Sequence, residues 1–155
     1  MHQLSAHFTL EEMVASQEAA RRGIDNTPSP AIIENLRATC ERLEAVRALL
    51  SRPIIVSSGY RSPELNKAIG GASNSAHMSG LAVDFICPSF GSPLAVCQAI
   101  EKSDLQYDQL IHEYGSWTHL AFDLERQRRQ ALSIFRSNQG YLAGLIDATA
   151  PINVG

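Results

Sequence analysis

The stretch Ser75-Ala76-His77-Met78-Ser79-Gly80-Leu81-Ala82-Val83-Asp84 places a histidine and an aspartate seven positions apart, and a second histidine follows at His119. Two imidazole nitrogens and one carboxylate oxygen suit a borderline metal such as Zn2+. Three protein ligands leave one coordination position open, which is typical of catalytic zinc. The pattern therefore predicts His77, Asp84 and His119 as ligands of one zinc ion and favours a metal-dependent hydrolase.

The apolar run that begins at Leu81 predicts a strand. Side chains alternate across a strand, so Leu81, Val83 and Phe85 should face the core and Asp84 the opposite side. A buried carboxylate without a partner is costly and needs a cation or strong donors. From spacing alone, a neighbouring arginine could serve Asp84 as well as a metal could, with His77 then an ordinary loop residue.

Two strands around the turn Tyr114-Gly115-Ser116 predict a hairpin. A turn centred on this glycine pairs Glu113 with Trp117, so that Glu113, Trp117 and His119 project from one face. Glu113 is then diagonal to His119, at about 7–8 Å between backbone positions. A carboxylate there can reach water at a metal without binding the metal, so Glu113 is the predicted catalytic base. An exposed glutamate at a hairpin end is the alternative.

Arg61 supplies a positive charge near the predicted site. The β-branched run Ile54-Ile55-Val56 predicts a short strand that ends in the turn Ser57-Ser58-Gly59, and Arg61 follows this turn. Its guanidinium could hold a substrate carboxylate through two hydrogen bonds or stabilise the oxyanion formed during hydrolysis. A solvated surface arginine is the alternative.

Capping and turn signals indicate an α+β fold: a small, antiparallel-rich sheet with helices packed on one face. The expected helices run from the Thr9/Glu12 capping box to near Gly23, from Pro30 to about Leu50, from Ser62-Pro63 to Ile69, and from Ser92-Pro93 through Ile100. The segment from Arg129 to Phe135 could be a strand beside the hairpin or a helical piece. Asn138-Gln139-Gly140 predicts a turn, and 148–155 an extended tail.

The composition predicts one globular domain over residues 1–155, because 155 residues with 45% hydrophobic content can bury a core. A net charge of -3 gives no general attraction to nucleic acid. Cys40, Cys87 and Cys97 lack metal-ligand spacing and are expected to be reduced, mostly buried thiols. The chain has no long apolar run and no signal-like start, so we expect a soluble chain made in the cytoplasm without membrane insertion.

The motifs resemble those of the zinc D-alanyl-D-alanine carboxypeptidases and related peptidoglycan peptidases of bacteria and phages. The family pattern Ser-x-His-x-x-Gly-x-Ala-x-Asp occurs at 75–84, Ser-Gly-Tyr-Arg at 58–61 and Trp-x-His at 117–119. Segments 7–12 and 26–28 also look like the start of phage-type members. The resemblance thus covers roughly residues 7 to 123 and supports residues 124–155 only loosely.

The resemblance implies a hedgehog/DD-peptidase-like fold and a zinc peptidase that acts on peptidoglycan peptide stems, either as a D,D-carboxypeptidase or as an endopeptidase of the endolysin type. It implies His77, Asp84 and His119 as zinc ligands, Arg61 as a substrate-binding or oxyanion-stabilising residue, and Ser75 as a substrate contact. Several members carry the glutamate three residues before the third ligand, where this chain has Ser116. Glu113, six residues before His119, matches the spacing of other members of the fold.

Two further expectations follow from the resemblance. The shared fold with a signalling domain leaves open a non-catalytic, zinc-containing module that binds the cell wall. Without an export signal, the chain could act on the wall as a phage lysis protein, as part of a virion or as a prophage product. Its oligomeric state is left undetermined by the sequence.

Overall fold

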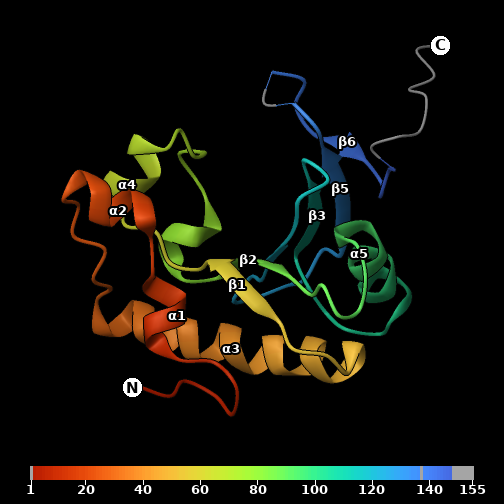
Figure 1. The fold of residues 1–155 in the computed structure, drawn as a ribbon, viewed down its shortest axis with the longest axis horizontal. Helices are drawn as coiled ribbons and strands as arrows, with labels where there is room; N and C mark the ends of the chain where they lie inside the picture. Colours follow the sequence, from red (N-terminus) through yellow and green to blue (C-terminus); the bar gives the residue numbers. More distant parts are fainter. Residues whose placement is uncertain (1, 137, 148–155) are drawn as a thin grey trace.

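A computed structural model describes residues 2–136 and 138–147, so the predicted tail at 148–155 lies outside the described residues. Its centre is a six-stranded sheet in the order β1-β2-β4-β3-β5-β6 (Figure 1). The strands are β1 Ile55–Ser58, β2 Ala82–Ile86, β3 Gln109–Glu113, β4 Trp117–Ala121, β5 Gln130–Ile134 and β6 Leu142–Ala143. Neighbouring strands are antiparallel except β3 and β5, which run parallel. The α+β class and the antiparallel-rich sheet are confirmed.

Serine caps define most of the helices. In three of them a proline at the first helical position follows a serine whose hydroxyl accepts a backbone N–H, which preorganises the first turn. The helices are α1 Leu10–Val14, α2 Gln17–Arg22, α3 Pro30–Leu50, α4 Pro63–Ala68 and α5 Pro93–Lys102, with a 3-10 turn η1 at Ala76–Ser79. The predicted helices starting at Pro30, Pro63 and Pro93 are thereby confirmed.

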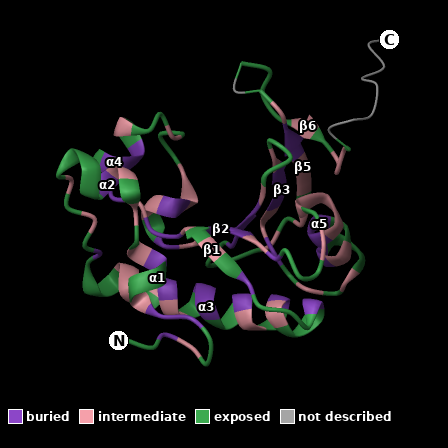
Figure 2. Ribbon diagram, viewed as in Figure 1, coloured by how far each residue is buried: buried purple, intermediate pink, exposed green. Residues whose placement is uncertain are grey.

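The main core lies on one face of the sheet, under α3 and α5. Leu36 and Leu43 of α3, Ile100 of α5, and Val83 and Phe85 of β2 are fully buried there. The sheet-facing side of α3 and most of β2 are buried, whereas the outer side of α3 is exposed (Figure 2). The opposite face of the sheet, bordered by α4 and η1, is left for the cleft described below.

Several local expectations need correction. The helix expected from Thr9 to Gly23 is two helices, because Ala15 is extended and Ser16 caps α2. Leu81 lies before β2 and lines the cleft, so its predicted place in the core is wrong. The segment after Arg129, which the sequence left open between strand and helix, forms strand β5.

Two expectations about the whole chain can be compared with the structure. The three cysteines are buried and free, as predicted. Among the described residues, none of the helices combines the length and apolar character that a membrane span requires.

Candidate active site

A cleft of about 880 Å3 lies on the sheet face opposite the main core. Its floor consists of alternate residues of the central hairpin, Gln109, Ile111 and Glu113 from β3 with Trp117, His119 and Ala121 from β4. The pairing of Glu113 with Trp117 is the one that the turn predicted. Strand alternation therefore brings Glu113 and His119 into one cavity.

Three predicted residues meet at the middle of this floor. Asp84 on β2 pairs with His119 on β4 across neighbouring strands, and η1 brings His77 in from the side. His119 Nδ1 donates to Asp84 Oδ1 at 2.8 Å, and His77 Nε2 lies 3.3 Å from the same oxygen. One candidate ligand atom from each residue lies within 4.8 Å of the others, and all three residues are buried.

The hydrogen bonds of His77 fit a cation at this point. Its Nδ1–H donates to the carbonyl of Gly59 at 2.7 Å, which leaves the Nε2 lone pair directed into the cluster. Nε2 is buried and has no hydrogen-bond partner among the described residues. A lone pair facing a carboxylate oxygen in a dry site is unfavourable unless a cation lies between them. The donor set of two imidazoles and one carboxylate therefore fits a bound zinc ion.

Asp84 and the two histidines shift one another's pKa values. Burial alone would raise the pKa of Asp84, but His77 and His119 outweigh it and hold this pKa well below its usual range. For His119, burial alone would lower the pKa. The hydrogen bond and charge of Asp84 outweigh burial and raise this pKa above its usual value. The pKa of His77 is lowered, chiefly by burial. A permanently ionised carboxylate beside a neutral imidazole is an arrangement suited to cation binding.

Glu113 is positioned beside the cluster rather than within it. Its Oε1 lies 3.7 Å from His119 Nδ1, and its Oε2 accepts a hydrogen bond from Trp117 Nε1 at 3.1 Å. Burial raises the pKa of Glu113, while the charge of His119 opposes the shift. The carboxylate is thus oriented by Trp117 and able to take up a proton close to the predicted metal.

Arg61 reaches the same cleft from the segment after β1. Its backbone N–H donates to the carbonyl of His77 at 3.1 Å, and its Nε is buried without a hydrogen-bond partner among the described residues. Burial lowers the pKa of Arg61 below its usual value, and the charges of Asp84 and Glu113 offset this shift only in part. The solvated-surface alternative is therefore wrong for this arginine.

Ser75 also lines the cleft, as the family pattern implied. Its hydroxyl oxygen accepts the backbone N–H of His77 at 3.2 Å and caps η1. A hydroxyl that accepts one bond can still donate another. Ser75 can therefore orient the His77 turn and contact a bound molecule at once.

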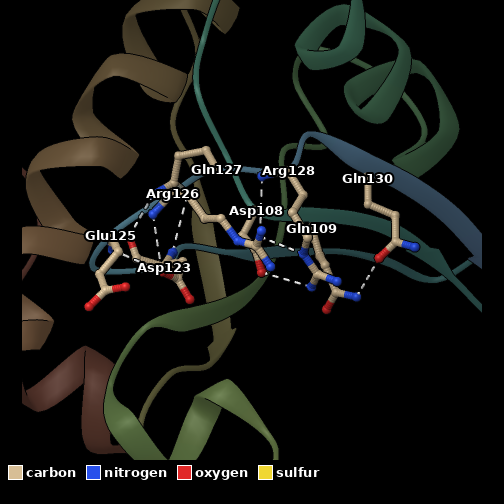
Figure 3. A network of polar contacts seen from close by, with 8 residues as sticks. All are labelled: Asp108, Gln109, Asp123, Glu125, Arg126, Gln127, Arg128 and Gln130. Atoms are coloured by element: carbon tan, nitrogen blue, oxygen red, sulfur yellow. Dashed lines mark hydrogen bonds and ion pairs between the residues drawn. The ribbon is translucent and has the colours of Figure 1, made fainter.

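A polar network borders the end of the cleft away from Glu113 (Figure 3). Arg128 donates from Nε and Nη2 to the two carboxylate oxygens of Asp108, at 2.8 and 3.0 Å. Asp123 accepts two backbone N–H groups in the adjoining turn, and Gln109 donates to Gln130 at 2.9 Å. Arg128 is therefore already paired, whereas Arg61 has no ion pair with a described residue.

Two contributors to the site escaped the sequence analysis. Tyr141, which precedes β6, lines the cleft although it lies 22 positions beyond His119. Gly71 follows the helix expected to end at Ile69, and a β-carbon there would clash with Asn66 Oδ1 and come within 3.1 Å of Arg61 Nη1. The pair Gly70-Gly71 was a signal for this close approach, whereas nothing local marks Tyr141.

Comparison with known proteins agrees with this geometry. A family model described as Peptidase M15 matches residues 6–121. A zinc D-Ala-D-Ala carboxypeptidase of Streptomyces albus G is 45% identical over 58 residues, which is 37% of this chain and 23% of that protein's length. The family match spans well over half of the chain and includes the whole His77, Asp84 and His119 cluster. The chain therefore belongs to the Peptidase M15 family.

Proposed function

We propose that the chain is a zinc-dependent peptidase that hydrolyses the peptide stems of bacterial peptidoglycan, as a D,D-carboxypeptidase or an endopeptidase, within a single domain of the hedgehog/DD-peptidase kind. The observation that carries the proposal is the unpartnered Nε2 of His77, buried against Asp84 and His119 with Glu113 alongside. The named activity of the Streptomyces relative supports the substrate class.

In this proposal His77, Asp84 and His119 hold zinc, and the remaining residues divide the work of hydrolysis. When bound, zinc would act as a Lewis acid for the scissile carbonyl and would lower the pKa of a water bound to it to about 7. Glu113 takes a proton from the attacking water and delivers it to the leaving amine. Arg61 stabilises the negative charge on the carbonyl oxygen, and Ser75 contacts the substrate backbone.

Each chain residue has the surroundings that its role requires. Trp117 fixes one oxygen of Glu113 and leaves the other facing His119. Arg61 has a buried Nε without a hydrogen-bond partner among the described residues, and in such a partly buried place a charged hydrogen bond is stronger than in water. The carbonyl of Gly59 sets the tautomer of His77, so that Nε2 is free to bind a cation.

The test is hydrolysis of purified muropeptides by the zinc-loaded chain, with and without a chelator, followed by mass spectrometry. We expect a new amine terminus that disappears on chelation and returns with zinc. Glu113→Gln should lower kcat by about 100-fold or more while zinc stoichiometry stays at one, because only the proton carrier is lost. Glu125→Gln, an exposed residue outside the cleft, is the matched control and should keep full activity.

Two results would contradict the proposal. If the zinc-loaded chain releases no product from any muropeptide, the chain is not this peptidase, and binding of wall fragments without turnover would favour the non-catalytic module. If Glu113→Gln retains zinc and cleaves at an undiminished rate, Glu113 is not the base.

A further inference from the structure

A second cavity of about 800 Å3 adjoins the cleft. It lies between the start of α2 with the two residues before it, the end of β1, and the last turn of α4. The two cavities share three lining residues, Ser58, Arg61 and Ile69. Arg61 therefore faces both cavities, with the His77 cluster on one side of it and the second cavity on the other.

The metal cluster lies in the middle of the first cleft rather than at an end. His119 is the central one of three β4 residues on the floor, between Trp117 and Ala121. Alternate residues of a strand are about 7 Å apart. The floor thus extends about one substrate residue beyond His119 in each direction along β4, and the second cavity lies on the other side of Arg61.

The positive charge of the first cleft lies beside the His77 cluster, and the arginine at the end of the cleft away from Glu113 is already paired. An exopeptidase that removes a C-terminal residue needs a cation at a closed end to bind the terminal carboxylate. Among the described residues that line the first cleft, Arg61 and Arg128 are the only lysine or arginine side chains, and Arg128 is paired with Asp108. Arg61 lies between the two cavities and lines both of them.

The second cavity also offers a surface suited to an extended peptide. Val56, Ser57 and Ser58 line it, and they belong to β1, the edge strand of the sheet. Edge strands bind extended peptides through main-chain hydrogen bonds, with side-chain pockets beside them. Ile69, 42% exposed, adds an apolar side chain that lines both cavities.

We propose that the chain is an endopeptidase, in which substrate residues on one side of the scissile bond occupy the first cleft and those on the other side continue past Arg61 into the second cavity. This inference rests on the proposed function and selects one of its two forms. Hydrolysis breaks the C–N bond and adds the hydroxyl of one water to the carbonyl carbon and its proton to the amine, so no co-reactant is needed. The substrate class is an internal bond of a stem peptide or of a peptide cross-link.

The test compares three substrates of the zinc-loaded chain: a stem pentapeptide with a free D-Ala-D-Ala terminus, the same peptide extended by four glycines and amidated, and a cross-linked muropeptide dimer. We expect the extended peptide or the dimer to be cleaved with a kcat/KM at least equal to that of the free acid. A fall of 100-fold or more for both blocked substrates would overturn the inference and leave the peptidase proposal standing. No metal-dependent cleavage of any substrate would overturn both.

A pair of variants tests the proposed path of the substrate from the first cleft into the second cavity. Ile69→Trp fills the junction of the cavities and should lower the kcat/KM for the extended peptide, relative to the free acid, at least fivefold. Ile55→Trp places the same residue on β1, 54% exposed and outside both cavities, and should leave this ratio unchanged. Equal ratios for Ile69→Trp and wild type, with zinc affinity and Tm retained, would contradict a substrate path through the second cavity.

Discussion

At the scale of single residues, two hydrogen-bond acceptors orient the imidazole rings of His77 and His119 toward a cation. The carbonyl of Gly59 holds the Nδ1–H of His77 and leaves its other nitrogen free, while Asp84 accepts from His119. The same carboxylate raises the pKa of His119 above its ordinary value of 6.5. Protons would therefore compete with zinc for His119 at a higher pH than they would for an ordinary histidine.

We predict that zinc affinity falls as pH falls through the raised pKa of His119. Below that pH the imidazole is protonated, so binding must release a proton and the dissociation constant should rise by about tenfold per pH unit. Competition with a chromophoric chelator between pH 5.5 and 8.5 measures this slope. His2→Gln, which changes an exposed histidine, should give the same profile. A constant affinity between pH 8 and 6 would contradict the prediction.

A second residue-scale prediction concerns Gly71. A β-carbon in Gly71→Ala would press on Asn66 Oδ1 and approach Arg61 Nη1, so the guanidinium should shift while the zinc ligands stay in place. Misplacement of a catalytic group by about 1 Å costs on the order of 100-fold, so we expect a 10- to 100-fold lower kcat/KM with unchanged zinc affinity. In an Arg61→Ala background the same change should have little further effect. Additive losses would contradict action through Arg61.

At the scale of elements, the segment around β6 completes the cleft by packing on β5. Ser133, fully buried on β5, donates to the carbonyl of Gly144 at 2.8 Å and accepts the backbone N–H of Ile146 at 2.9 Å. Strand pairing joins Leu142 to the same residue. These contacts hold Tyr141 at the cleft, and the Ser133 hydroxyl supplies two of them.

We predict that Ser133→Ala weakens this attachment. The change leaves two partly buried backbone groups without the Ser133 hydroxyl, which should reduce the free energy of unfolding by about 1–3 kcal/mol. Amide hydrogen exchange should accelerate at 141–146 before it does so in α3, and kcat/KM should fall because Tyr141 is no longer held in place. Ser73→Ala, in an exposed loop, is the control. Unchanged exchange at 141–146 would show that Ser133 does not anchor the segment.

At the scale of the whole molecule, a zinc ion bound by the proposed ligands would connect parts that are distant in sequence. His77 comes from η1, Asp84 from β2 and His119 from β4, so a bound ion favours the folded chain over an unfolded one that separates these residues. The cluster is buried between the sheet and the loop that carries η1. Loss of the ion should therefore lower the free energy of unfolding of the whole fold.

We predict that zinc at a thousand times its dissociation constant stabilises the fold by about 4 kcal/mol. For a chain of this size this corresponds to a rise in Tm of about 8–16 °C. Differential scanning calorimetry with zinc, with magnesium and with chelator measures the shift, and magnesium should have little effect because it prefers oxygen ligands. An equal rise in His119→Ala would show that the stabilising zinc binds elsewhere.

The sequence by itself determined the elements whose signals are local. Serine-proline caps, apolar periodicity and a glycine-centred turn predicted three helices and the register of the hairpin, because each depends on residues a few positions apart. Register then placed Glu113 and His119 on one face. Tertiary structure alone decided the strand pairing of 130–134, the approach of Tyr141 to the cleft, and the second cavity. Each of these depends on contacts between segments far apart in the chain, which local propensity does not encode.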